Sequence, residues 1–325
     1  MEGKKMEWVL VGFGLVILLG SGDFLVRGAV NLALRLGVTP LIVGLTIVAL
    51  GTSAPELLVS IKAALGGVPG IALGNIVGSN ITNIFLILGL PAIIVALHTS
   101  EYNTKKSYMI MIGATVLFTG LASAGVFNMW SGIALLSFLA LFIFDALRGA
   151  MIERKATAKA SSLQEDIGEV PNGADPSMTV YKIAIYLVVG LIGLPYGADL
   201  LVGNATIIAK NFGVSDTVIG LTLIALGTSL PELATTLVSA LRRQADVALG
   251  NVIGSNIFNL LGVMGVAALV TPITVDPQFL YFDFWIMLSA SLLLVPFVFF
   301  KKDITRKWGF GLTALYLAYM TLTLL

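Results

Sequence analysis

Long apolar stretches alternate with short polar turns along the whole chain. Each stretch has about 20 mostly apolar residues, the length that an α-helix needs to cross the hydrocarbon core of a bilayer. We therefore expect an all-α polytopic membrane protein, in which the first and sixth helices are long enough to be tilted. Ten transmembrane helices are predicted, at residues 7–34, 39–65, 70–97, 107–123, 129–148, 180–210, 215–241, 246–270, 280–299 and 307–324.

Composition supports a membrane protein. Hydrophobic residues make up 57% of the chain and charged residues 11%, whereas soluble domains carry about 25% charged residues. The net charge of +1 argues against a nucleic-acid partner, and the absence of cysteine excludes disulfides and zinc–thiolate sites. The single histidine, His98, falls in a predicted loop. The apolar run after Lys5 is longer than the core of a signal peptide, so we expect a first transmembrane helix there.

One polar stretch, from about Arg148 to Ser177, separates the fifth and sixth predicted helices. It is rich in Glu, Asp, Lys, Ser and Pro, a composition typical of a flexible linker. We therefore divide the chain into residues 1–149 (helices one to five), a linker at 150–179, and residues 180–325 (helices six to ten).

The Lys and Arg residues predict the orientation, because cytoplasmic loops carry an excess of them. One side receives only Lys4, Lys5, Lys62 and Lys210. The other side, which we expect to be cytoplasmic, receives Arg35, Lys105, Lys106, Arg148, Arg154, Lys155, Lys159, Lys182, Arg242, Arg243, Lys301, Lys302, Arg306 and Lys307. The expected location is the cell membrane, with both termini outside and the linker in the cytoplasm.

The two halves are copies of each other. Glu56 pairs with Glu232 at a separation of 232 − 56 = 176, and Gly37 pairs with Gly213 at the same separation. About half of the positions from 37 to 89 are identical in the second copy. Internal repeats of this kind are typical of transporters. Because five helices per copy is an odd number, the second copy is expected to be inverted in the membrane.

The first repeated motif is Gly-Thr-Ser-x-Pro-Glu, at residues 51–56 and 227–232. Pro55 lacks an N–H and clashes with the carbonyl of Gly51, so the helix should break there and free nearby carbonyls. Thr52 and Ser53 lie four and three residues before Glu56, on one helical face. Thr228, Ser229 and Glu232 repeat the pattern. The hydroxyls could simply bond the backbone, but an ionisable residue inside a membrane is usually functional.

The second repeated motif is Gly-Asn-x-x-Gly-Ser-Asn-x-x-Asn, at residues 74–83 and 250–259. Ser79 and Asn83 are four residues apart and can face the helix that carries Glu56; Ser255 and Asn259 are their counterparts. The glycines favour close helix packing over ion ligation. We leave Asn80 and Asn256 outside the site, as side chains that bond neighbouring helices.

Together the two motifs supply only oxygen ligands, which hard cations prefer. Calcium takes roughly 6–8 oxygens and tolerates irregular geometry. Two carboxylates balance one Ca²⁺ or two monovalent ions, so calcium and sodium would compete for the same pair. The expected activity is secondary antiport by alternating access, with no cofactor and with inorganic cations and the lipid bilayer as the only partners, in a functional monomer.

Both motifs closely resemble the two alpha repeats of the cation/calcium antiporter superfamily, especially prokaryotic sodium/calcium exchangers. The resemblance implies exchange of Ca²⁺ for Na⁺ and a first and sixth helix that slide together as a gate. It implies a calcium site at Glu56 and Glu232, helped by the carbonyls of Thr52 and Thr228. It also implies sodium sites that use Ala49, Ser53, Ser79 and Asn83, and Ala225, Ser229, Ser255 and one of the glutamates.

Asn259 departs from the pattern of many relatives, which carry Asp at that position. A neutral amide argues against potassium-dependent exchange and leaves the monovalent partner open, so a Ca²⁺/H⁺ or Li⁺-competent exchanger is the alternative. A remote alternative is an intramembrane aspartyl protease using Asp23, in Gly-Ser-Gly-Asp, and Asp199. Duplication accounts for both aspartates, however, and Arg27 lies one turn from Asp23 as a possible ion partner. A channel is a further alternative, which would need no counter-ion.

Overall fold

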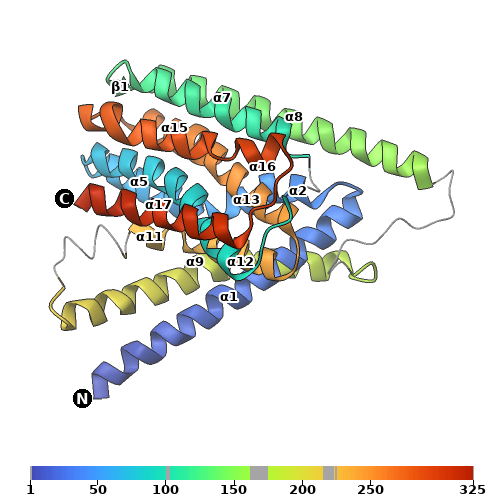
Figure 1. The fold of residues 1–325 in the computed structure, drawn as a ribbon, viewed down its shortest axis with the longest axis horizontal. Helices are drawn as coiled ribbons and strands as arrows, with labels where there is room; N and C mark the ends of the chain where they lie inside the picture. Colours follow the sequence, from blue (N-terminus) through green and yellow to red (C-terminus); the bar gives the residue numbers. More distant parts are fainter. Residues whose placement is uncertain (1, 100–102, 162–174, 215–222, 224, 325) are drawn as a thin grey trace.

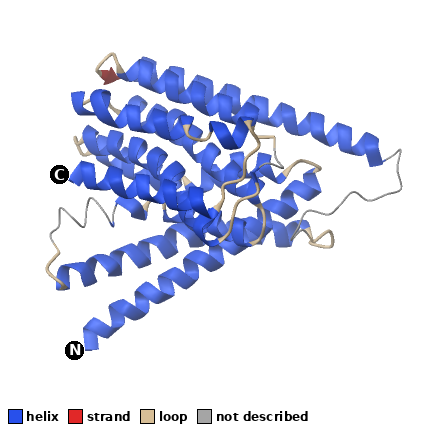
Figure 2. Ribbon diagram, in the orientation of Figure 1, coloured by secondary structure: helices blue, strands red, loops and turns tan. Residues whose placement is uncertain are grey.

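A computed structural model describes residues 2–99, 103–161, 175–214, 223 and 225–324 (Figure 1). Nearly all of these residues are helical (Figure 2). The strands among these residues are two short segments. Six helices among them are long and apolar enough to cross a membrane. A seventh span is added if the bent pair Pro40–Thr52 and Ala54–Leu65 is counted as one. The prediction of an all-helical membrane protein is thus confirmed.

Two long helices, α1 (Glu2–Leu36) and α9 (Val180–Asn211), pack side by side and cross the rest of the bundle at an angle (Figure 1). Glycines allow their backbones to approach closely. A Cβ atom added to Gly190 would lie 2.6 Å from the Cβ of Leu25, and one added to Gly197 would lie 2.8 Å from the backbone nitrogen of Leu18. Other glycines of these helices, such as Gly12 and Gly203, have nothing within 4 Å. The predicted close contact therefore uses only part of their glycine content.

The beginning of α9 is also tied to α1 by hydrogen bonds. Asn31 accepts a hydrogen bond from the backbone N–H of Asp175 at 2.7 Å, and Arg35 donates one to the carbonyl of Met178 at 3.4 Å. Thr179 then caps α9 by accepting a hydrogen bond from the N–H of Lys182. The two long helices are thus joined at one end as well as along their lengths.

Each half next contains a helix that breaks before its glutamate. In the first half, α2 (Pro40–Val43), the π-helical segment Gly44–Val48 and α3 (Ala49–Thr52) lead to α4 (Ala54–Leu65), with a bend of 40°. In the second half, α11 (Ala225–Gly227) leads to α12 (Leu230–Leu241). Proline occupies the first turn of α4 and of α12, where its missing N–H costs no helical hydrogen bond. The predicted breaks are therefore confirmed.

Two buried helices follow the broken ones and form the centre of the bundle. The first consists of α5 (Pro69–Thr82), the π-helical segment Asn83–Ile87 and α6 (Gly89–Ile94). The second consists of α13 (Ala245–Ile257), the π-helical segment Phe258–Val263 and α14 (Met264–Val270). Most residues of both are inaccessible, unlike those of α1 and α9. In each of the two, the backbone hydrogen bonds change from the α-helical to the π-helical pattern at or next to an asparagine, Asn83 or Asn259. Such π-helical turns often mark functional positions.

The remaining helices cover this centre on the side away from α1 and α9 (Figure 1). They are α7 (Lys105–Ala122), α8 (Met129–Ser161), the π-helical segment Phe279–Asp283 with α15 (Phe284–Leu292), α16 (Val295–Phe299) and α17 (Arg306–Leu324). Short strand pairings join the two halves. Strand β1 (Val126–Phe127) pairs antiparallel with β2 (Ile273–Thr274), and Leu97 forms a single bridge with Ile304.

The helix boundaries correct one prediction. The fifth helix was expected to end at residue 148, but α8 continues to Ser161, well into the predicted linker. The added residues include several of the strongest helix formers, namely Ala, Met, Glu, Arg and Lys. These residues can extend a helix beyond its apolar part. Residues 162–174 of the linker, and 215–222 at the predicted start of the seventh helix, lie outside the described residues.

We predict that Gly190→Val separates α1 from α9, because the new side chain would collide with the backbone of Leu25. Overpacking of this kind costs about 1–3 kcal/mol, so the unfolding midpoint in detergent should fall. The control is Gly203→Val on the same helix, where nothing lies within 4 Å of the added Cβ. Equal midpoints for the two variants would contradict the close contact.

Candidate cation site

Two glutamates are buried in the interior of the molecule. Glu56 is in the first turn of α4 and Glu232 is in the first turn of α12, and both are 0% exposed. Each therefore sits at a helix N-terminus, where free N–H groups favour negative charge. A carboxylate removed this completely from water needs hydrogen bonds and positive charge to stay ionised.

Each glutamate is bonded by a serine from the other half of the chain. Ser53 donates a hydrogen bond to Oε1 of Glu232 at 3.4 Å, and Ser229 donates one to Oε1 of Glu56 at 3.3 Å. The serines stand at the helix breaks, one residue before α4 and α12. The breaks thus turn each half's hydroxyl toward the partner half's carboxylate. The structure therefore brings the two copies of the first motif together.

Several buried oxygens of the predicted site residues have no hydrogen-bond partner among the residues that the structure describes. They are Oε2 of Glu56, Oε2 of Glu232, Oδ1 of Asn83 and Oδ1 of Asn259. The amide nitrogen of Asn259 is likewise without a partner in the described chain. A buried polar atom left unpaired costs about 1–3 kcal/mol. Carboxylate and amide oxygens are the ligands of hard cations, so this donor set fits such an ion.

The other predicted hydroxyls lie beside this cluster. The hydroxyl of Ser79 lies 3.4 Å from that of Ser229, which donates its proton to Glu56. In another contact between the halves, the hydroxyl of Thr52 lies 3.5 Å from that of Ser255. All four are buried. Thr228, at the second break, is partly buried.

The backbone at the first break is only partly released. The carbonyl of Ala49 accepts the N–H of Ser53 at 3.0 Å and the hydroxyl of Thr52 at 3.4 Å. The expected release of nearby carbonyls does not extend to Ala49, because the N–H of Ser53 keeps its helical hydrogen bond to that carbonyl. A carbonyl oxygen has two lone pairs, so its role as an ion ligand stays a prediction. Ala225 is the first residue of α11.

Two asparagines that the sequence analysis did not assign support both glutamates. Asn75 donates hydrogen bonds to the backbone carbonyl of Glu56 at 3.1 Å and to Ser60 at 3.0 Å. Asn251 donates to the carbonyl of Glu232 at 3.4 Å and to Thr236 at 3.2 Å. The two asparagines are repeat equivalents, and they therefore make equivalent hydrogen bonds in the two halves.

These asparagines also connect the halves. Asn251 accepts a hydrogen bond from Thr52 at 3.2 Å, and Asn75 accepts one from Thr228 at 3.4 Å. A signal in the sequence could have found them, because Asn75 lies four residues before Ser79 and eight before Asn83. Residues at this spacing share one helical face, and Asn251, Ser255 and Asn259 repeat it.

The two asparagines left outside the site differ in their contacts. Asn256 accepts a hydrogen bond from Asn83 at 2.9 Å and so orients a predicted site residue from the other half. It also contacts Met111 of α7. Asn80 instead bonds the carbonyl of Ile76 in its own helix. Asn256 therefore bonds neighbouring helices as expected, and one of its partners is the predicted site residue Asn83. Asn80 does not, because its hydrogen bond stays within its own helix.

Comparison with known proteins agrees with this geometry. The chain matches the protein family described as sodium/calcium exchanger protein over residues 6–147 and 182–325. The chain belongs to the sodium/calcium exchanger family. It is 32% identical over 345 residues to the sodium/calcium exchanger MaX1 of Methanosarcina acetivorans, covering 97% of each chain. It is 38% identical over 287 residues to the inner membrane protein YrbG of Escherichia coli, covering 86% of this chain and 85% of that one.

A solved structure shares the fold. The sodium-calcium exchanger NCX_Mj, in crystals soaked with Na⁺ and Ca²⁺, superposes with a TM-score of 0.78 at 33% identity. The match covers 97% of this chain and 98% of that chain. Members of this exchanger family are secondary transporters, so the protein is a membrane antiporter of the cation/calcium superfamily and not an enzyme.

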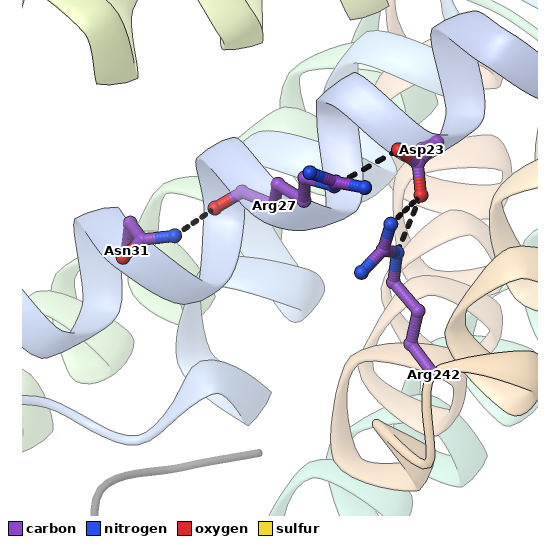
Figure 3. Close-up of polar contacts among 4 residues, drawn as sticks. All are labelled: Asp23, Arg27, Asn31 and Arg242. Atoms are coloured by element: carbon purple, nitrogen blue, oxygen red, sulfur yellow. Dashed lines mark hydrogen bonds and ion pairs between the residues drawn. The ribbon is translucent and has the colours of Figure 1, made fainter. Parts of the chain in front are cut away.

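The two aspartates of the protease alternative do not form a catalytic pair. Asp23 on α1 lies 2.9 Å from Nε of Arg27, as the sequence predicted, and it also contacts Arg242 at the end of α12 (Figure 3). Asp199 on α9 is exposed. A carboxylate held by two guanidinium groups is a structural ion pair, and membership of a transporter family removes the reason to assume proteolysis.

We predict that Asn251→Ala weakens cation binding, because it removes the bonds to the Glu232 carbonyl and to Thr52. Loss of a group that orients a ligand costs about 10–100-fold in metal affinity. Asn80→Ala is the control, since Asn80 donates only to its own helix. Calcium titration of purified protein measures both variants, and unchanged affinity in Asn251→Ala would contradict the assignment.

Proposed function

We propose that the protein exchanges Ca²⁺ for Na⁺ by alternating access at the pair formed by Glu56 and Glu232. The observation that carries the proposal is the reciprocal bonding of each buried glutamate by a serine of the other half. The relatives MaX1 and NCX_Mj, which are named sodium/calcium exchangers, support the choice of ions.

The proposed calcium ligands are the two carboxylates and the carbonyls of Thr52 and Thr228. Two negative charges balance one Ca²⁺ and also balance two Na⁺, so either cargo leaves the site neutral. The proposed sodium ligands are Ser53, Ser79, Asn83 and the Ala49 carbonyl in the first half. In the second half they are Ser229, Ser255, Asn259 and the Ala225 carbonyl, and one of the two glutamates completes the set. Because both ions need the same carboxylates, they bind in turn and not together.

We also propose that ten membrane spans form two inverted repeats, residues 1–149 and 180–325. The constant separation of 176 residues supports the duplication. Equal turns support it too. The backbone N–H groups of Gly66 and Gly67 bond the carbonyls of Lys62 and Ala64, and those of Arg242 and Arg243 bond the equivalent carbonyls of Val238 and Ala240.

The excess of Lys and Arg on one side supports a cytoplasmic linker at 150–179 and external termini. The protein would then lie in the cell membrane and act as a monomer, since both glutamates come from one chain. The name of the relative YrbG, an inner membrane protein, agrees with this location.

A Ca²⁺/H⁺ or Li⁺-competent exchanger remains the second candidate, and Asn259 is the observation that favours it. Asn259 is fully buried and neutral, and none of its side-chain atoms has a partner among the described residues. The site therefore carries two carboxylates and no third. Fewer charges hold fewer monovalent ions, and a proton can neutralise a carboxylate as sodium does.

We predict that purified protein in sodium-loaded liposomes takes up calcium, driven by the outward sodium gradient. Glu56→Gln should abolish this uptake. The variant keeps the size of the side chain but loses the charge that calcium needs. Potassium, lithium and proton gradients, imposed in turn, identify the counter-ion. Uptake that needs no counter-ion would indicate a channel, and uptake retained in Glu56→Gln would contradict the site.

We further predict that acid weakens calcium binding. A proton on Glu56 or Glu232 removes one of the two charges that balance Ca²⁺, so the affinity should fall as the pH falls. Calcium titrations at neutral and clearly acid pH measure this effect. Equal affinities at both would show that the carboxylates do not bind the ion.

A further inference from the structure

An ion-pair cluster joins α1 to the end of α12. Asp23 of α1 contacts Nη2 and Nε of Arg242 and lies 2.9 Å from Nε of Arg27 on its own helix (Figure 3). The Asp23 side chain is 31% exposed and that of Arg242 is 27% exposed. Screening by water is therefore limited, and a charge-assisted pair with a guanidinium is stronger than a neutral hydrogen bond.

The packing on both sides of this cluster places α1 firmly on α12. Val26 and Val30 of α1 form a buried cluster with Val238 of α12. Near Glu232, a Cβ atom added to Gly22 would lie 3.4 Å from the backbone of Ala234. The ion pair thus lies beside an extended apolar contact between a long outer helix and the helix that carries Glu232.

The equivalent surface of the first half is uncovered. Ala234 is 2% exposed, but its equivalent Leu58 (234 − 176 = 58) is 59% exposed. Val238 is buried, but its equivalent Lys62 (238 − 176 = 62) is exposed. The structure is therefore asymmetric: α1 covers α12, whereas the corresponding face of α4 is free among the described residues.

The charges of the cluster are asymmetric as well. The equivalent of Asp23 is Asp199, but the equivalents of Arg27 and Arg242 are Gly203 and Gly66. The turns that hold Gly66 and Arg242 have the same backbone hydrogen bonds. The first half thus has the place for a guanidinium but lacks the side chain, and no ion pair of Asp199 occurs in the described chain.

We propose that Asp23 and Arg242 form a one-sided latch that stabilises the access state seen here. The inference rests on the proposed function, in which the opposite access state arises when the halves exchange conformations. In that state α9 would cover α4 and bring Asp199 toward Gly66, where no positive charge awaits it. The opposite state therefore loses the ion pair of Asp23 and Arg242 without gaining an equivalent pair at Asp199. The ion pair thus shifts the equilibrium toward the state seen here.

Cysteine labelling tests the latch directly, because the natural chain has no cysteine. Two single-cysteine reporters, Val238→Cys and Lys62→Cys, occupy equivalent positions on α12 and α4. Labelling by a water-soluble maleimide reports whether each face is covered. In the Asp23→Asn background, the labelling rate at position 238 should rise about fivefold or more, and that at position 62 should fall, because an ion pair worth about 1 kcal/mol corresponds to this factor.

Asp199→Asn is the matched control, since it removes the equivalent carboxylate without removing an ion pair, and it should change neither rate. Arg242→Lys keeps the charge and should retain most of the protection. Gly66→Arg supplies the missing guanidinium and should lower the labelling rate at position 62, even if Asp23→Asn proves too unstable to study. Rates unaltered by both Asp23→Asn and Gly66→Arg, or equal changes in Asp199→Asn, would overturn the latch.

Calcium flux measured on the unlabelled wild-type chain separates this proposal from the proposed function. Absent exchange would refute the function, whereas the labelling ratios report the contact between helices in either case. Exchange that persists together with unaltered ratios would refute the latch alone.

Discussion

Two carboxylates that share a buried place repel each other, and the structure depends on this constraint. At a separation of about 4 Å and an effective dielectric near 20, the repulsion is about 4 kcal/mol. Glu56 and Glu232 are completely buried, and each receives a serine hydroxyl from the opposite half. These long hydrogen bonds cannot supply the missing positive charge. In the proposed function, a bound cation supplies that charge, and the empty pair is disfavoured from moving because its charges are not balanced.

The helices around the pair serve this electrostatic requirement. The breaks before α4 and α12 aim two helix N-termini at the carboxylates, while Asn75 and Asn251 fix the backbone behind them. Other hydrogen bonds cross between the halves, from Thr52 to Asn251 and from Thr228 to Asn75, and these join the inner helices to each other. By contrast, α1 and α9 pack mainly on each other through glycine contacts. The molecule thus combines a hydrogen-bonded polar centre with a pair of outer helices that pack closely on each other.

The sequence predicted most of the site because the same motif occurs twice in an apolar setting. Glu56, Glu232 and their hydroxyl neighbours could be predicted without knowing the fold, because an ionisable residue within a membrane helix is usually functional. Asn75 and Asn251 were overlooked, although their four-residue spacing from the serines was visible. Arg242 could not have been paired with Asp23, because that contact depends on how α1 lies against α12. The extension of α8 was missed because hydrophobicity marks the part of a helix within lipid and not its solvated end.

The short strand pairings have a mechanical consequence. Leu97 pairs with Ile304, and Phe127 pairs with Ile273, which is the repeat equivalent of Leu97 (97 + 176 = 273). Each clasp joins one half to the other, and in an inverted architecture the two clasps fall at opposite faces of the membrane. The halves are thus joined by backbone hydrogen bonds at two separate places, in addition to the covalent connection between them. The cohesion of the two halves therefore does not depend on the covalent connection between α8 and α9 alone.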